Sequence, residues 1–372
     1  MPITEPQQIA YDAYLQNDRS IRATARALNE AYSGVRRKII TAEKWINASE
    51  GQKAAIENTG LDITSGQHGW RKVKNKDGSA DSVFWKADSA VDATAMIEAI
   101  REGLESLPPP AVYDCKAGPD NLAAIFPVAD LHTGLLTDAE ELGEDWDSKI
   151  AQAHFQRTFG RLVSVTPSAG VALIGQLGDL THSDDQRNVT PQSGHQLDVD
   201  TRYFMILRRA TGLMKWAIEA LRQKYARVIY RGCRGNHDMT SHYAMTLALS
   251  EYYAGVDGVE IITDANEFYV WQFGANMMLL HHGDKARPER LVTFAAAQWP
   301  EIWGATKHRL TLSGHVHHET RKEIGGMAFE SIGTIIPRDS FAYSHAYTAT
   351  RGLISMVLDK VEGEISRNRV SL

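Results

Sequence analysis

Five short apolar runs, each ended by a cluster of Gly, Asp, Asn or His, constrain the fold of this chain more than any other feature. They are AAIFPVADLHTG (123–134), VALIGQLGDLTHSDD (171–185), RVIYRGCRGNHD (227–238), MMLLHHGD (277–284) and HRLTLSGHVHHE (308–319). Runs of this length are typical of strands buried on both faces, and helical patterns such as 201–224 lie between them. The polar clusters follow the carboxyl ends of the strands, where α/β sheets place their sites. The pattern therefore predicts an α/β fold with a site at one sheet edge.

The composition is that of a globular protein. The chain has 372 residues, of which 43% are hydrophobic and 23% charged, and this length predicts two to three folded units. The net charge of −6 gives no overall basic surface, so nucleic-acid binding would need a local basic patch. Only two cysteines occur, and we find neither a signal peptide nor a run of the roughly 18 apolar residues that a membrane helix needs. We therefore expect a cytoplasmic protein with no membrane partner; the sequence carries no prediction of its oligomeric state.

Residues 1–50 have the pattern of a small helical domain. Apolar residues recur at helical spacing over 6–16, a second helix is expected over 20–29, and a third over 30–46. Three short helices with a basic third one match a DNA-binding helix-turn-helix, and a bundle with a solvated basic face is the equal alternative. The candidate DNA contacts on the third helix are Arg36, Arg37 and Lys38.

Residues 51–110 are expected to connect this domain to the next. The stretch 69–87 has the pattern of a β-hairpin, and its basic first arm is similar to the wing of a winged helix. That arm adds Lys72 and Lys74 to the candidate DNA contacts. A helix over about 90–107 then ends at three prolines, which form a stiff spacer. We expect the domain boundary there, with a second domain over 118–372.

The polar clusters contain side chains that bind metal ions. They are Asp130-x-His132, Gly178-Asp179, Asn236-His237-Asp238, His281-His282 and His315-x-His317. Carboxylate, amide and imidazole ligands without thiolates suit Mn²⁺, Fe or Zn²⁺, with Mg²⁺ also possible. An x between two ligands places both side chains on the same side of an extended segment, so both can reach one ion. One such pair is a weak signal, but five clusters that each end a strand predict a metal centre.

In this order, the clusters resemble the motifs of the calcineurin-like metallophosphoesterase superfamily: Asp-x-His, Gly-Asp, Gly-Asn-His-Asp/Glu, His and Gly-His-x-His. The resemblance covers roughly 120–335 and implies two β-sheets packed as a sandwich and flanked by helices. It also implies two divalent metal ions, of which Mn²⁺ is the first expectation. A DNA-binding-like module joined to such a domain looks like phage or prophage gene products.

The resemblance assigns the metal ligands residue by residue. Asp179 would bridge the two ions, and His281 competes with His282 for one position. The first ion would be held by Asp130, His132 and His317, and the second by Asn236, His282 and His315.

The resemblance also implies the reaction. Two cations roughly 3.5–4 Å apart would share a hydroxide that attacks phosphorus in line. His237 would protonate the departing oxygen as a general acid. Asp238 either orients His237 or caps the following helix.

The segment GDLTHSDD bears on the substrate. His182 stands where serine/threonine phosphatases commonly have an Asp, and no Arg follows before Arg187. Gly-Asp-Leu-x-His is similar to Mre11-type nucleases, in which the matching histidine lies in the active site; otherwise His182 only supports His237. This favours a phosphodiesterase or nuclease over a phosphomonoesterase. A DNA-binding regulator with an inert phosphoesterase scaffold is the non-enzymatic alternative.

Basic residues near the motifs are candidate substrate contacts. Lys285 and Arg287 follow the fourth motif, and Arg202 lies in the polar insertion 183–204 after the second. Each could attract phosphate, and a solvated surface pair is the alternative for each.

Overall fold

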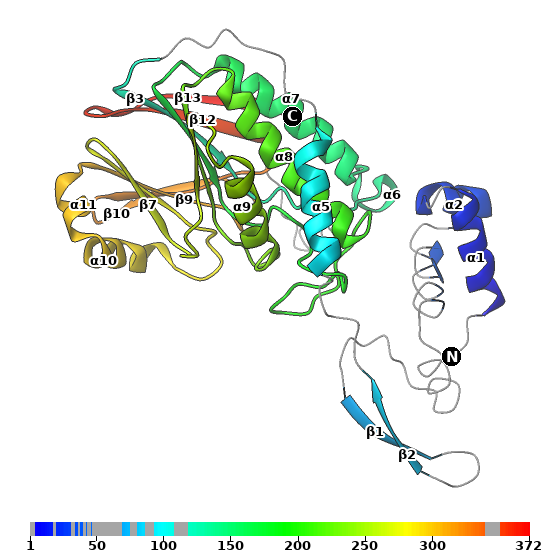
Figure 1. Ribbon diagram of the computed structural model, residues 1–372. Helices are drawn as coiled ribbons and strands as arrows, with labels where there is room; N and C mark the ends of the chain where they lie inside the picture. Colours follow the sequence, from blue (N-terminus) through cyan, green and yellow to red (C-terminus); the bar gives the residue numbers. More distant parts are fainter. Residues whose placement is uncertain are drawn as a thin grey trace. The chain divides into compact units, whose positions relative to one another are not determined.

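The computed structural model describes residues 4–17, 20–30, single positions within 34–46, strands 69–74 and 80–85, and residues 93–107, 118–338 and 350–372. The chain divides into two compact units, Met1–Ala90 and Val91–Leu372 (Figure 1).

The first unit contains a small helical core. Helix α1 (Glu5–Gln16) begins at Thr4 and α2 (Ile21–Leu28) at Ser20, whose hydroxyl accepts a hydrogen bond from Ala23 N at 3.2 Å. The described positions between 34 and 46 are also helical. The residues that bury one another are Ala10, Ala25, Val35 and Ile39. Helices α1 and α2, and the described helical positions within 34–46, lie where the sequence predicts helices.

The first unit also contains the predicted hairpin. Strands β1 (Gly69–Lys74) and β2 (Ala80–Trp85) pair antiparallel. Lys72 and Lys74 lie on β1. Lys38 pairs with Glu30 at 2.5 Å, whereas Arg36 and Arg37 lie outside the described residues. The proposed DNA contacts thus stay predictions.

The second unit is built on two β-sheets. The six-stranded sheet has the order β13 (Gly363–Ser371), β12 (Gly352–Asp359), β3 (Leu122–Val128), β4 (Val171–Gln176), β5 (Arg227–Gly232), β6 (Val259–Ile262). The five-stranded sheet has the order β10 (Thr320–Ile324), β11 (Met327–Ser331), β9 (His308–Ser313), β8 (Asn276–Leu280), β7 (Tyr269–Phe273). Strands β3 to β6 run parallel, as do β8, β9 and β11, while β12 runs antiparallel to β3 and to β13. Because neighbouring parallel strands end on the same side of a sheet, the polar clusters that follow them lie close together at the carboxyl ends of the strands.

Helices cover the outer face of each sheet (Figure 1). The six-stranded sheet packs against α7 (Ser148–Val165), α8 (Tyr203–Arg222) and α9 (Ser241–Tyr252), and α5 (Ala93–Ser106) packs on α8 and α9. The five-stranded sheet packs against α10 (Pro288–Gln298) and α11 (Pro300–Ala305), and the short α6 (Ala139–Leu142) lies between β3 and α7 in the chain. The predicted helix-flanked two-sheet α/β sandwich is confirmed.

Alternation along the strands builds the two sides of the core. On β3, Ala124 and Phe126 face the helices, whereas Ala123 and Ile125 face the other sheet. The layer between the sheets also includes Leu173, Ile229, Met278, Leu280, Leu312 and Met356. Because both faces of β3 to β5 are buried, their sequences read as continuous apolar runs.

Helix α5 belongs to the second unit. Gly103 lies so close to α8 that a Cβ atom there would overlap the carbonyl oxygen of Arg208 and touch the Cβ of Thr211. This close packing requires Gly at position 103. The expected boundary at 108–110 follows α5 and lies outside the described residues.

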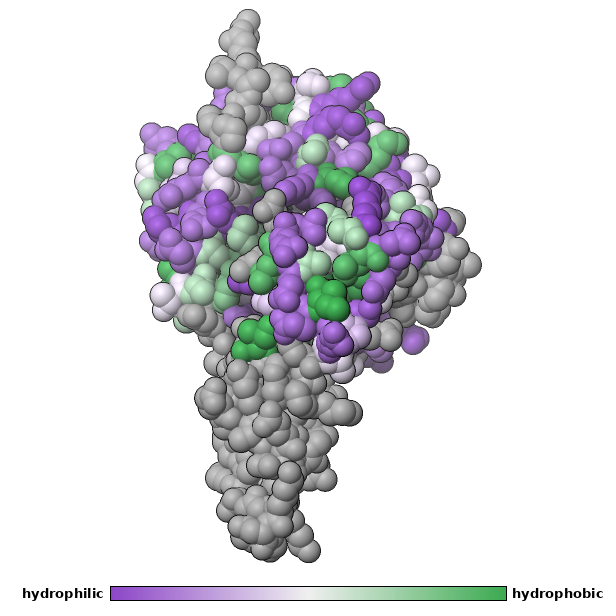
Figure 2. Space-filling view, turned by 90° about the vertical axis from the view of Figure 1, so that its right-hand side faces the viewer, coloured by the Kyte–Doolittle hydropathy of each residue, from purple (hydrophilic) through white to green (hydrophobic). Residues whose placement is uncertain are grey.

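The surface mixes hydrophilic residues with small groups of hydrophobic ones, as the face in Figure 2 shows. Exposed apolar residues scattered in this way are normal for a folded domain. None of the helices in the described residues has the length and apolar character to cross a membrane.

Candidate metal centre

The loops after five strands meet at one end of the sandwich and are joined by backbone hydrogen bonds. His132 N donates to the carbonyl of Asp179 at 2.9 Å, which connects the loops after β3 and β4. His315 N donates to the Asp130 carboxylate at 2.9 Å, which connects the loops after β9 and β3. Gly314 N donates to the carbonyl of His282 at 2.8 Å. The clusters from both sheets therefore form one site.

The backbone of this site is strained. Seven non-glycine residues in the described part of the chain have positive φ, and five of them are predicted metal ligands. These five are Asp130, His132, Asp179, His315 and His317, with φ of 50°, 39°, 52°, 71° and 57°. Such backbone costs about 1–3 kcal/mol per residue and persists only where the surrounding structure holds it, which is typical of functional sites.

The first group of potential ligands consists of Asp130, His132 and His317. One donor atom from each lies within 4.8 Å of the others. His132 Nε2 is 3.1 Å from His317 Nε2, and Asp130 Oδ1 is 3.8 Å from His317 Nε2. Asp130 and His132 are buried, whereas the His317 side chain is 30% exposed, so this donor set meets solvent at His317.

The second group consists of Asp179, His282 and His315, again with donor atoms within 4.8 Å of one another. His282 Nε2 lies 2.9 Å from Asn236 Oδ1 and 3.3 Å from Asp179 Oδ2. His282 Nδ1 lies 2.8 Å from the carbonyl of Leu177, where it donates a hydrogen bond and leaves Nε2 for a metal. Metal-ligating histidines are commonly oriented in this way.

Asp179 lies between the two groups. Its Oδ2 is 3.7 Å from His132 Nε2 on one side and 3.3 Å from His282 Nε2 on the other. Its Oδ1 accepts a hydrogen bond from His237 N at 2.8 Å, which fixes the carboxylate. The position fits the predicted bridging role.

The titratable groups at the site perturb one another strongly. Burial raises the pKa of Asp130 to about 8, and the nearby Asp179 carboxylate acts in the same direction while His282 opposes it. Burial lowers the pKa of His132 well below its ordinary value, and His237 adds to this effect. Against its own burial, the attraction of Asp179 raises the pKa of His282 to about 10. A divalent ion in each group would offset the buried carboxylates, and the donor set suits such ions. The residues of each group fit a divalent metal ion.

His237 and His182 form a pair beside the first group. The rings of His182 and His237 stack with centroids 5.4 Å apart, and His237 Nδ1 lies 2.8 Å from the carbonyl oxygen of His182, to which it donates. His182 Nδ1 is 3.1 Å from His132 Nδ1. His182 therefore contacts both a candidate ligand and the candidate acid.

Asp238 does something that neither sequence alternative described. Its buried carboxylate accepts hydrogen bonds from the backbone N–H groups of Gly235 and Leu180, both at 2.7 Å, and of Asp179 at 3.2 Å. It therefore joins two loops and does not orient the His237 ring. The start of α9 is instead held by Asp184, which accepts from Thr240 N at 2.8 Å and Ser241 N at 2.7 Å. Sequence reasoning missed Asp184, because nothing local links it to a helix more than fifty residues away.

The remaining candidates are not part of either ligand group. His282 faces the ligand groups, whereas the His281 ring lies 5.6 Å from the ring of Phe268. Lys285 pairs with Glu267 at 3.3 Å. Arg287 and Arg202 are exposed at the starts of α10 and α8.

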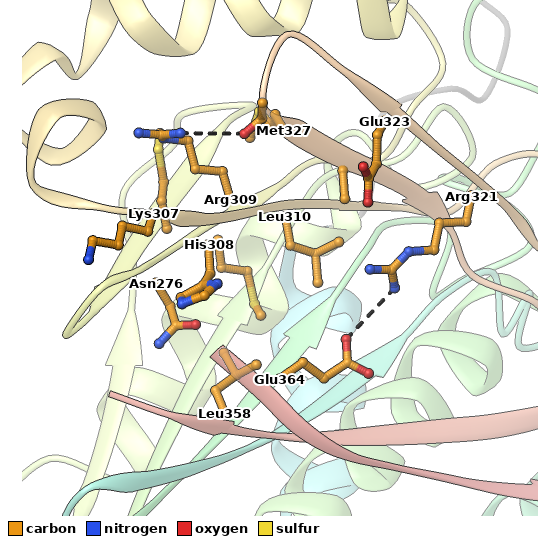
Figure 3. Close-up of a pocket in the computed structure, with 14 residues that line it drawn as sticks. Asn276, Lys307, His308, Arg309, Leu310, Arg321, Glu323, Met327, Leu358 and Glu364 are labelled. Atoms are coloured by element: carbon orange, nitrogen blue, oxygen red, sulfur yellow. Dashed lines mark hydrogen bonds and ion pairs between the residues drawn. The ribbon is translucent and has the colours of Figure 1, made fainter. Parts of the chain in front are cut away.

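A cavity of about 300 Å³ lies away from the candidate metal centre, where β8 and β9 begin (Figure 3). Arg321 and Glu364 lie 3.7 Å apart across it, and Arg309 donates to the carbonyls of Trp303 and Thr306. None of the candidate metal ligands lines it. Arg309, Arg321 and Glu364 bind partners within the protein, so the cavity does not carry the chemistry of the candidate metal centre.

Comparisons with known proteins find similarity to this chain only among solved structures. No known family and no curated protein matches the sequence. Vps29 complexed with zinc from Entamoeba histolytica aligns at 13% identity over 67% of this chain and 98% of that chain, with a TM-score of 0.29. A predicted phosphoesterase from Streptococcus pneumoniae aligns at 13% identity over 68% and 98%, with a TM-score of 0.26. An archaeal phosphodiesterase aligns at 10% identity over 67% and 99%, with a TM-score of 0.32. Because these sequence identities and TM-scores are low, the chemistry of the site is inferred from the side chains of this chain alone.

Proposed function

We propose that the chain is a dinuclear-metal-dependent phosphoesterase that hydrolyses phosphodiesters in nucleic acid. The observation that carries the proposal is the position of Asp179 Oδ2 between two ligand groups, 3.7 Å from His132 Nε2 and 3.3 Å from His282 Nε2. Two divalent ions, Mn²⁺ first among them, would neutralise phosphate oxygens and lower the pKa of a bound water.

His237 is the proposed general acid. Its Nδ1 donates to the carbonyl of His182, so in the protonated ring Nε2 carries the proton available for a leaving oxygen. The stacked ring of His182 and the backbone bond from His237 N to Asp179 hold this imidazole next to the ligand groups. The side chain is half-buried, so a substrate can reach it.

Two observations support a diester over a monoester. His182 contacts both His132 and His237, and it occupies the sequence position where the phosphatase pattern has a carboxylate. Arg187, the first Arg after this motif, pairs with Asp185 at 2.5 Å on the surface and so is not available to clamp a terminal phosphate. We further propose that the first unit, with Lys38, Lys72 and Lys74, contributes to nucleic-acid binding.

Paired rate measurements test the proposal. Hydrolysis of bis(p-nitrophenyl) phosphate and of p-nitrophenyl phosphate is measured with Mn²⁺, with Asp179→Asn as the inactive variant and Asp257→Asn, an exposed carboxylate, as its matched control. We expect Mn²⁺-dependent turnover that favours the diester and disappears only in Asp179→Asn. Faster monoester cleavage would point to a phosphomonoesterase. No turnover and no bound metal would instead favour the non-enzymatic alternative.

A further inference from the structure

A third group of potential metal ligands adjoins the first. It consists of His132, His182 and His237, and one donor nitrogen from each lies within 4.8 Å of the others. His132 also belongs to the first group, whereas His182 and His237 lie outside both groups assigned to the two ions. The assignment of two ions therefore does not explain why three imidazoles gather here.

The two ring nitrogens of His132 face different groups. Its Nε2 lies 3.1 Å from His317 Nε2 in the first group, and its Nδ1 lies 3.1 Å from His182 Nδ1. Two nitrogens bound to one tetrahedral Zn²⁺, each about 2.0–2.1 Å from the ion, are about 3.3 Å apart. The two Nδ1 atoms are thus nearly as far apart as two ligands of one ion. Without an ion, one of them must carry a proton that the other accepts, and a cation would replace that proton.

His237 can supply the third nitrogen. Its Nδ1 donates to the carbonyl oxygen of His182 at 2.8 Å, which fixes the ring and leaves Nε2 as the nitrogen with a lone pair in the neutral form. Metal-ligating histidines are commonly oriented by such a bond. The rings of His132 and His237 are nearly perpendicular, with centroids 4.6 Å apart. His132 and His182 are buried and His237 is half-buried, so an ion would enter from solvent past His237.

The donor set of this third group differs from those of the other two. It contains three imidazoles, whereas Asp130 and Asp179 contribute a carboxylate to the first and second groups. Three histidines with one open position suit Zn²⁺, while Mn²⁺ favours carboxylate and water oxygens. Zn²⁺ also binds nitrogen ligands more tightly than Mn²⁺ does. The third group should therefore select Zn²⁺ in a protein whose other groups accept Mn²⁺.

We propose that His132, His182 and His237 form an inhibitory zinc site. Zn²⁺ on His237 Nε2 would occupy the atom that carries the proton for the leaving oxygen. It would also require His132 Nδ1 without its proton, and a ring with a second ion on Nε2 then keeps no proton at all. Zinc in the third group and an ion in the first group would therefore weaken each other's binding. The inhibition rests on the proposed phosphodiesterase function, whereas the zinc site itself does not.

Zinc binding by the full chain tests the site without any measurement of activity. The protein is dialysed against saturating Mn²⁺ and increasing Zn²⁺, and both metals bound per chain are measured. His237→Gln removes one nitrogen of the third group and leaves both groups assigned to Mn²⁺ complete. We expect the first zinc ion to bind at least about 100-fold more weakly to this variant, because loss of an orienting residue alone costs about 10–100-fold. His195→Gln, an exposed histidine, is the matched control and should bind zinc as the wild type does.

Zinc that merely replaces manganese in the other two groups would bind equally to the wild type and to His237→Gln, and this result would overturn the site. Rates with bis(p-nitrophenyl) phosphate and Mn²⁺ then test the inhibition. We expect turnover by the wild type to stop at the zinc concentration that fills the third group and to return when Mn²⁺ is raised. Unchanged turnover at that concentration would overturn the inhibitory role. If the ester is not hydrolysed even without zinc, the proposed function fails, and dialysis still decides whether the zinc site exists.

Discussion

The buried carboxylate of Asp238 accepts a hydrogen bond from the backbone N–H of Asp179 at 3.2 Å. The same carboxylate accepts from Leu180 N and Gly235 N, both at 2.7 Å. It therefore fixes the loop that carries the proposed bridging ligand against the loop that carries Asn236 and His237. The position of the ligands depends on a residue that binds no metal itself.

Asp238→Asn should weaken both the fold and metal binding. An amide supplies one oxygen, so its NH₂ group must face a backbone N–H, which costs about 1–3 kcal/mol. We expect a lower melting temperature and a Mn²⁺ affinity reduced about 10–100-fold, as for other groups that orient ligands. Thermal unfolding and metal titration measure the two effects, with Asp257→Asn as control. Unchanged affinity would show that the loops hold their geometry without this carboxylate.

Asp179→Asn should abolish turnover while the first unit stays folded. The substitution keeps the size of the side chain and removes the negative charge between the two ligand groups, so at least about a 100-fold loss of rate is expected. Initial rates with Mn²⁺ and circular dichroism of the full chain give the two readouts. Substantial retained activity would rule out the bridging assignment.

Gly235 has no room for a side chain. A Cβ atom there would overlap the carboxylate and backbone nitrogen of Asp179. Gly235→Ala should therefore destabilise the second unit by about 3 kcal/mol or more, since the contact involves backbone that cannot move freely. Gly304→Ala on α11, with nothing within 4 Å of the added Cβ, should be neutral or stabilise by up to about 1 kcal/mol. Urea unfolding of both variants checks the contrast, and similar stability for the two would contradict it.

The sequence carried enough information for the sandwich and for the side chains that gather at its edge. Each apolar run is long enough for one strand, and a polar cluster at its end is local information. The residues next to His281 and His282 do not decide which of the two is the ligand, because this depends on the direction in which the chain leaves β8. His282 contacts Leu177 and Asn236 from the other sheet, which no spacing rule encodes.

The role of Asp238 was predicted wrongly for the same reason. Its neighbours in sequence suggest a helix cap or a partner for His237, but its hydrogen bonds go to a loop about sixty residues earlier in the chain. Asp184, which holds the start of α9, and the pairing of Arg234 with Glu267 also arise only from tertiary contacts. Residues that support a site are the part of it least visible in sequence.

His182→Gln should weaken metal binding although His182 is outside both ligand groups assigned to the ions. Its Nδ1 lies 3.1 Å from His132 Nδ1 and so fixes the orientation of that ligand, and its ring stacks on His237. We expect a Mn²⁺ affinity about 10–100-fold lower, together with slower turnover. His195→Gln, an exposed histidine in the following loop, is the matched control. Equal affinity of the two variants would mean that His132 is held by other contacts.

His242 should make the fold sensitive to acid. Burial lowers the pKa of His242 to about 3, and Arg231 and Arg234 act in the same direction. In the unfolded chain His242 binds a proton near its ordinary pKa of about 6.5. The free energy of unfolding is therefore unaffected by this residue above pH 6.5 and falls as the pH drops from 6.5 toward 3. Each pH unit below 6.5 lowers the free energy of unfolding by about 1.4 kcal/mol, which amounts to about 2 kcal/mol at pH 5. Urea unfolding at pH 7.5 and pH 5 should give a smaller loss for His242→Gln than for the wild type; identical losses would show that this histidine is not the group that titrates.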